Sequence, residues 1–264
     1  MNDILAQTLF VKDRKAFMRI KGIAENLRNE CGFECIMGED VSKILDEYTK
    51  RNNLKVEILQ YNFKDDELWA FTFLKKGTVF VCVNSGLEIG KCFFALAHEL
   101  YHIYCYIENP SKSYIKNGSL QTEEGNGDAE DMEANAFAGV LLLNDSALEG
   151  YRNRIVDENL IFELMETFCL PCKAVVLRLY ECGIMDCDQT YYWLNYGVEK
   201  VKKHISFSDR NARSLQKKNQ VSLGSLEENY QIARDRGFGK ESRLEKDSCY
   251  IKELMNKLKS SNEV

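Results

Sequence analysis

The sequence has few histidines, few prolines and no long apolar run. Its 264 residues include three histidines, two prolines and 16 glycines, which excludes a collagen-like or low-complexity chain. The longest apolar stretches, at residues 92–97 and 137–143, are far shorter than the ~20 residues of a membrane-spanning helix. The first residues also lack the basic and then apolar layout of a secretory signal. We therefore expect a cytoplasmic globular protein that makes no membrane contact.

The net charge of −6 is the sum of two parts of opposite sign. Residues 199–264 hold 15 lysines and arginines against 10 acidic residues, so this part is basic and the rest is acidic. A basic segment attracts nucleic-acid phosphates. Acidic residues are nevertheless mixed among the basic ones, which favours a solvated helical tail over a nucleic-acid-binding surface. Nucleic-acid binding therefore stays open but is not the favoured interpretation.

The hydrophobic pattern predicts several helices and one group of strands. Aromatic and β-branched residues indicate strands at 54–61, 67–74 and 78–84, the last two joined by a turn at 75–77. A polar loop is expected at 108–128. Asp40 is the expected N-cap of the second helix. Helical periodicity covers residues 14–29, 40–51, 88–106, 129–143, 159–169 and 173–182.

Two of the three histidines stand in the segment His98-Glu99-Leu100-Tyr101-His102. Residues four apart lie on the same face of a helix, so both imidazoles can bind one metal ion. Glu99 is rotated by roughly 100° from His98, which holds its carboxylate beside the metal rather than among the ligands. Zinc lowers the pKa of a bound water to roughly 7, and a neighbouring carboxylate can take up the proton. The spacing therefore predicts a catalytic zinc site with Glu99 as the general base.

A catalytic zinc site also needs a third protein ligand and one open position. Candidates come from the acidic start of the next helix, where Glu130 and Asp131 lie within about 60° of the centre of the apolar stripe and Glu133 about 100° away. We favour Asp131 as the third ligand. His204 is expected to be a solvated histidine of the basic tail. The apolar stripe itself consists of Ala134, Phe137, Ala138, Leu141 and Leu142.

Two segments follow each other in a characteristic order. The first is the predicted strand at 79–84, which ends in Asn84, together with the run KCFFALAHELYH at 91–102. The second is the run DMEANAFAGVLLL at 131–143. They resemble the strand, the FTLAHELGH-type helix and the ExEANxFAxxLLMP segment of the ImmA/IrrE family of metallo-endopeptidases. The resemblance covers residues 40–186.

The resemblance implies an α+β fold with a zincin-like core, in which a small three-stranded sheet packs on the HExxH helix. It implies His98 and His102 as zinc ligands and Glu99 as the catalytic base. The leading glutamate of the family's second segment aligns with Asp131, whose shorter side chain must bring its helix closer to the ion. Glu133 is therefore the fallback ligand.

Four parts of the chain are predicted. Residues 1–39 form an N-terminal helical segment and residues 40–150 the metallopeptidase core. Residues 151–190 form a helical unit, in which residues 161–184 resemble the family's small helical unit and suggest a helix-turn-helix. Residues 191–264 form a mostly helical, basic C-terminal appendage.

The ten cysteines of a chain without an export signal indicate reduced thiols rather than a disulfide framework. The pair Cys169 and Cys172 could join Cys182 and Cys187 in a structural zinc site, because Cys-x-x-Cys can bind one ion. Yet Cys182 ends a predicted helix and has no second close cysteine. We favour the turn of the helix-turn-helix-like unit as the explanation.

The resemblance implies a zinc-dependent endopeptidase that cleaves a specific regulatory protein, such as a helix-turn-helix repressor or an antitoxin. The loop at 108–128 lies between the two ligand-bearing helices and could gate or shape the cleft. The alternative is a non-proteolytic, metal-binding regulatory protein. It would act through DNA or protein binding by its helix-turn-helix-like unit and its basic appendage.

Overall fold

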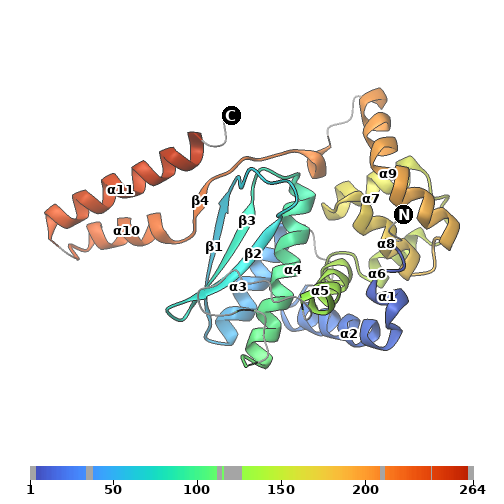
Figure 1. Ribbon diagram of the computed structural model, residues 1–264, viewed down its shortest axis with the longest axis horizontal. Coiled ribbons are helices and arrows are strands. Elements are labelled where there is room, and N and C mark those ends of the chain that lie inside the picture. The colour runs from blue at the N-terminus through green and yellow to red at the C-terminus, as the bar shows by residue number, and fades with distance from the viewer. Residues whose placement is uncertain are drawn as a thin grey trace.

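The computed structural model describes residues 4–33, 38–111, 115, 127–208, 212–238 and 240–260. In this part of the chain, helices pack around a mixed four-stranded sheet, which confirms the α+β class (Figure 1). The strands are β1 (Lys55–Tyr61), β2 (Ala70–Lys75), β3 (Thr78–Asn84) and β4 (Ser222–Leu223). The helices are α1 (Leu9–Lys12), α2 (Arg14–Glu30), α3 (Val41–Arg51), α4 (Ile89–Glu108), α5 (Gly127–Leu142), α6 (Asp145–Leu148), α7 (Glu158–Phe168), α8 (Cys172–Glu181), α9 (Cys187–Ser208), α10 (Leu226–Asp235) and α11 (Glu241–Ser260).

The sheet has the order β2-β3-β1-β4, so the prediction of three strands was wrong by one. β1 runs parallel to β3, and β2 pairs with β3 as an antiparallel hairpin. The predicted turn is confirmed: Lys76 and Gly77 both have positive φ, at 51° and 78°, which matches the twist of a tight hairpin. The fourth strand, β4, adds antiparallel to β1. Two residues are too few to show a strand period, so only tertiary pairing creates β4.

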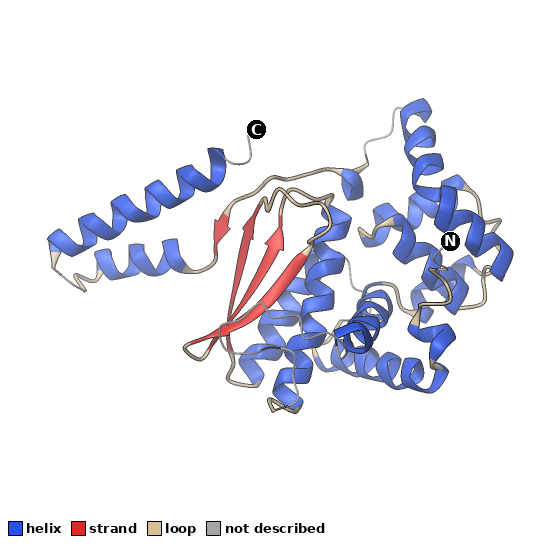
Figure 2. Cartoon of the chain, viewed as in Figure 1, coloured by secondary structure: helices blue, strands red, loops and turns tan. Residues whose placement is uncertain are grey.

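The alternation of side chains along the strands gives the sheet one helix-covered face. Val79, Val81 and Val83 of β3 are at most 2% exposed and belong to the main core, with α4 packed on the same strands. Phe73 and Phe80 stack at 5.1 Å between ring centroids on the other side of the same strands. Figure 2 shows the helices of the core beside the sheet, while the last two helices project beyond the β4 edge.

Buried contacts at its first turn fix the position of α4. Asn84, 1% exposed, donates to the carbonyls of Asp65 and Leu68 and accepts from the backbone N–H of Phe63 and Gly86, which ties the end of β3 to the preceding loop. An added Cβ at Gly90 would lie 3.0 Å from the backbone of Leu170. Glycine therefore lets α4 approach the turn between α7 and α8.

The apolar stripe of α5 is confirmed, because Ala134, Phe137, Ala138, Leu141 and Leu142 are all at most 1% exposed. Asp40 stands at the N-cap position of α3 as expected, but its side chain does not cap the helix. Asp40 has helical angles (φ −77°, ψ −15°), makes no capping hydrogen bond and pairs with Lys43 at 2.8 Å. The reason is that a short 3-10 helix, Gly38–Asp40, runs directly into α3, so the chain at Asp40 already follows a helical path.

The C-terminal part of the chain contacts the core at two places. α9 crosses the predicted boundary at 190 and packs on α7 and α8. A strap, residues 212–225, then crosses the start of α4, where the backbone N–H of Ile89 donates to the carbonyl of Gln216. The domain boundaries stay predictions. Among the described residues, no helix combines the length and apolarity of a membrane span.

Candidate metal centre

Two neighbouring helices bring His98, His102 and Asp131 together. The Nε2 atoms of His98 and His102, one turn apart on α4, lie 3.1 Å from each other. Asp131 Oδ1, from the first turns of α5, lies 3.6 Å from His98 Nε2 and 3.4 Å from His102 Nε2. Within the described ranges, these three form the one group of histidine, cysteine and carboxylate side chains that could hold a metal ion.

The other nitrogen of each imidazole faces an acceptor. His98 Nδ1 lies 3.0 Å from Asn135 Oδ1, and His102 Nδ1 lies 2.8 Å from Glu130 Oε1. With the ring proton held on Nδ1, each Nε2 presents its lone pair to the centre. Two such nitrogens and a carboxylate oxygen repel one another unless a proton or a metal ion lies between them. The donor set therefore fits a divalent metal ion with one position left open.

The charges around His102 favour a cation at this place. Burial lowers the pKa of His102, but hydrogen bonds to Asp131 and Glu130 outweigh it and raise this pKa to about 9. The same pairing with His102, together with that to His98, holds the pKa of Asp131 well below its usual range. A metal ion must displace the proton that these carboxylates attract, so metal binding releases protons.

Glu99 lies beside the centre and is almost completely buried, with 6% of its surface exposed. Thr72 Oγ1, from the helix-covered face of β2, donates a hydrogen bond of 2.5 Å to Glu99 Oε2. The hydroxyl fixes the orientation of the carboxylate. A small cavity of about 220 Å³ adjoins Glu99 and His98 and is also lined by Trp69 and Phe94.

Glu133 points away from the three ligand atoms. Tyr101 Oη donates to Glu133 Oε2 at 2.5 Å, and Arg19 of α2 pairs with the other carboxylate oxygen. These bonds join α4 and α2 to α5. For Glu133 to become a ligand, both would have to break.

Three residues of the site were not assigned these roles from the sequence. Asn135 stands four residues after Asp131 on the same helix face, a spacing that could have indicated its place. Glu130 was recognised as facing inward but not as the partner of His102. Thr72 is a polar residue at an inward-facing position of a strand. Its departure from the apolar pattern of that face could have indicated a functional role.

The remaining candidates lie apart from the centre. His204 of α9 is partly buried rather than solvated, because its ring packs against Phe162 with 6.4 Å between centroids. Cys169 and Cys172 are buried at the turn before α8, and burial raises the pKa of their thiols to about 11 and about 12. The four cysteines considered for a second zinc site form no ligand group in the described structure. The predicted loop 108–128 falls largely outside the described residues.

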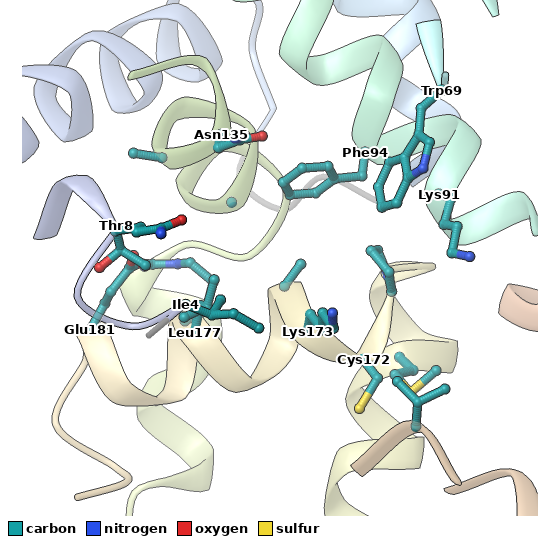
Figure 3. A pocket seen from close by; sticks show the side chains of 18 of the residues that line it. Ile4, Thr8, Trp69, Lys91, Phe94, Asn135, Cys172, Lys173, Leu177 and Glu181 are labelled. Atoms are coloured by element: carbon teal, nitrogen blue, oxygen red, sulfur yellow. The ribbon is translucent and has the colours of Figure 1, made fainter. Parts of the chain in front are cut away.

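A larger cavity of about 910 Å³ begins at Asp131 and Asn135 and extends to α8 and α9 (Figure 3). α8 contributes its one side that is not packed in the core, with Lys173 and Leu177 facing the cavity. The centre thus opens onto a cleft large enough for a segment of another chain.

A helix with two histidines and a catalytic-type glutamate, followed by a helix that supplies a carboxylate, defines the metallopeptidase class. Residues 51–180 match the family model of the IrrE N-terminal-like domain of the M78 peptidases. The chain belongs to this ImmA/IrrE metallopeptidase family, whose members act on protein substrates. A comparison with curated proteins finds no match.

Proposed function

We propose that the protein is a zinc-dependent endopeptidase that cleaves a specific regulatory protein, of the repressor or antitoxin type. His98, His102 and Asp131 are the metal ligands, and Glu99 is the general base. One observation carries the proposal: three ligand atoms lie within 4.8 Å of one another, next to a buried carboxylate.

In this proposal the chain's own residues prepare proton transfer. When bound, zinc would lower the pKa of a water ligand to roughly 7 and would polarise the substrate carbonyl. Thr72 holds Glu99 by one oxygen, so the carboxylate is oriented to accept a proton and to return it to the leaving amine. Asn135 and Glu130 hold the two imidazoles in the tautomer that a metal requires.

The free edge of β2 is suited to an extended substrate. β2 is the outer strand of the sheet, and no strand of the described chain pairs with its other side. Leu68 and Trp69, just before β2, line the small cavity at Glu99. A peptide that adds to such an edge forms backbone hydrogen bonds that depend little on its sequence. Selectivity must then come from elsewhere.

The alternative, a DNA-binding regulator, finds little support in the helix-turn-helix-like unit. Six of the ten residues of α8 are buried. Of the others, Lys173, Leu177 and Glu181 line the large cavity, and Tyr180 packs on Phe10 with 5.3 Å between ring centroids. The unburied side of α8 therefore faces the cleft and the helices across it, rather than an open surface that could dock in a DNA groove.

The proposal is tested by co-expressing the protein with the products of genes that neighbour its own. We expect one product to be cleaved, and Glu99→Gln to retain the metal while cleavage falls by about 10²–10⁴-fold. His98→Ala should lose both metal and cleavage. Glu133→Gln is the matched control and should keep both. Cleavage that persists in Glu99→Gln would contradict the mechanism, and metal loss in Glu133→Gln would make Glu133 a ligand.

A further inference from the structure

The large cavity separates the metal centre from the C-terminal helices. In Figure 3, α4 and α5 form one wall and α8 the facing one, and residues of α1 and α9 also line the cavity. Its volume of about 910 Å³ lies near the upper end of typical ligand sites, about 300–1,000 Å³. Such a space suits a peptide segment better than a single side chain.

Lysines dominate the charged side chains that line this cavity. They come from four helices: Lys12 from α1, Lys91 from α4, Lys173 from α8 and Lys202 from α9. Figure 3 shows Lys91 and Lys173 on facing walls. Four ammonium groups in one cleft are unexpected in a chain of net charge −6.

Two of the four lysines have no carboxylate partner in the described structure. Glu88 contacts the other two and lies 3.6 Å from Lys91 and 3.2 Å from Lys202. The two without such a partner are Lys12 and Lys173. Within the described part of the chain, the polar partner of Lys12 Nζ is the sulfur of Met132, at 3.6 Å.

The other charged groups of the cavity balance among themselves. Arg178, 2% exposed, pairs with Glu181 and with Asp145. Asp131 belongs to the metal centre, where the two positive charges of a divalent ion would outweigh the single negative charge of its carboxylate. The field in the cleft is therefore positive, and a complementary partner carries carboxylates.

Apolar side chains line the cavity between the lysines. They include the rings of Trp69 and Phe94 at the end near the metal centre, and Leu177, Val201 and Leu215 on the opposite wall. Lys91 Nζ lies 5.5 Å from the Trp69 ring centroid, so the cationic and apolar parts adjoin each other. A matching segment combines apolar side chains with acidic neighbours.

We propose, resting on the proposed peptidase function, that this cleft binds an acidic segment of the protein substrate. Carboxylates of that segment pair with Lys12, Lys91, Lys173 and Lys202, while its apolar side chains fill the cavity. Lys12 and Lys202 lie outside residues 51–180, the range that matches the family model. The flanking helices α1 and α9 thus add substrate selectivity to the peptidase core.

The test measures binding to the zinc-loaded Glu99→Gln protein, so that no cleavage interferes. The probes are two fluorescein-labelled libraries of short peptides with the same randomised apolar centre, flanked either by Asp and Glu or by Lys and Arg. Fluorescence anisotropy should give at least about tenfold tighter binding of the acidic library at low salt. The difference should largely disappear near ~1 M salt, where charges are screened within about 3 Å.

Charge reversal assigns this preference to the cleft. In the same Glu99→Gln background, Lys12→Glu with Lys173→Glu should weaken binding of the acidic library about tenfold and strengthen that of the basic one. Lys12→Gln with Lys173→Gln removes the two charges without reversing them and should lower the affinity for the acidic library about threefold. This milder double variant keeps the test valid if the charge-reversed protein misfolds. The control, Lys252→Glu with Lys259→Glu on exposed positions of α11, changes the net charge equally and should have no effect.

Three outcomes would overturn the proposal: equal binding of the two libraries, unchanged binding after both lysine replacements, or an equal loss in the α11 control. None of these outcomes would contradict the peptidase function, which is tested separately by Glu99-dependent cleavage. Conversely, if no cleavage is found, the peptide-binding measurement can still be made and interpreted.

Discussion

The region that carries the metal centre and the C-terminal hairpin, α10 with α11, are built in opposite ways. In α5, Ala134, Phe137 and Ala138 have no exposed surface, and the helix is enclosed by α2, α4 and α8. No residue of α10 is buried, and in α11 only Ile251 is. Buried side chains hold a helix in place, because a shift would open a cavity or cause a clash.

This difference follows what each region has to do. Three ligand atoms from two helices must stay within a few tenths of an ångström of metal-binding positions, which only a close-packed core ensures. The hairpin is joined to the core by β4 and by Ser225, which donates to Glu57 through its backbone N–H at 2.8 Å and its hydroxyl at 2.5 Å. Substitutions in the two regions should therefore differ strongly in effect.

The largest effect is expected from replacing the buried Arg178 by alanine. Its guanidinium donates to the Leu143 carbonyl at 2.8 Å and pairs with Asp145 at 2.6 Å and with Glu181. Without it, Glu181 is left buried and uncompensated, and breaking such a pair costs about 3–5 kcal/mol. Urea denaturation should show this loss in the free energy of unfolding.

An arginine of the hairpin provides the matched control. The side chain of Arg243 is 83% exposed and lies 4.0 Å from Asp247. Because exposed ion pairs contribute little, Arg243→Ala should change the free energy of unfolding by less than about 0.5 kcal/mol. Similar losses in the two variants would mean that the hairpin is as firmly packed as the core.

A smaller effect, on metal binding rather than folding, is expected from Asn135→Ala. The variant removes the acceptor that faces His98 Nδ1, so the imidazole loses its fixed tautomer and orientation. Loss of such a partner typically lowers metal affinity about 10–100-fold. Competition with a zinc chelator measures this, and Asn135→Asp, which keeps an acceptor oxygen, should largely restore it.

The corresponding control is Asn229→Ala in α10, where the exposed Asn229 donates through Nδ2 to the Ser225 hydroxyl at 2.7 Å, far from the metal centre. Its metal affinity should equal that of the parent. An unchanged affinity in Asn135→Ala would show that the partner of His98 has no part in holding the ion.

Apart from the control variants, the smallest effect is expected from deleting residues 226–264. The deletion removes the hairpin but keeps β4 and Ser225, and it uncovers little apolar surface because the hairpin buries one side chain. Metal content should stay the same, and the free energy of unfolding should fall by less than about 1 kcal/mol. A protein that aggregates or loses its metal after this deletion would contradict the comparison between the regions.

Much of the fold could be predicted from local patterns. The hairpin of β2 and β3 follows from alternating apolar residues and from Lys76-Gly77, whose positive φ values suit a tight turn. The buried stripe of α5 follows from its spacing. Asp40 stands at the expected N-cap position, but its side chain does not cap α3 because the chain before it is already helical, which depends on the neighbouring 3-10 turn and not on Asp40 itself.

The sequence by itself determined what depends on spacing within one element. This includes the two histidines on one face of α4, the glutamate beside them, and the apolar stripe that sets which face of α5 packs on the core. Only the tertiary structure decided how the acidic residues of α5 are used, with Asp131 at the centre, Glu130 behind His102 and Glu133 bound to Tyr101. It also decided that β4 joins the sheet and that lysines of four helices share one cleft. The reason is that distances between elements are set by core packing, which no local period encodes.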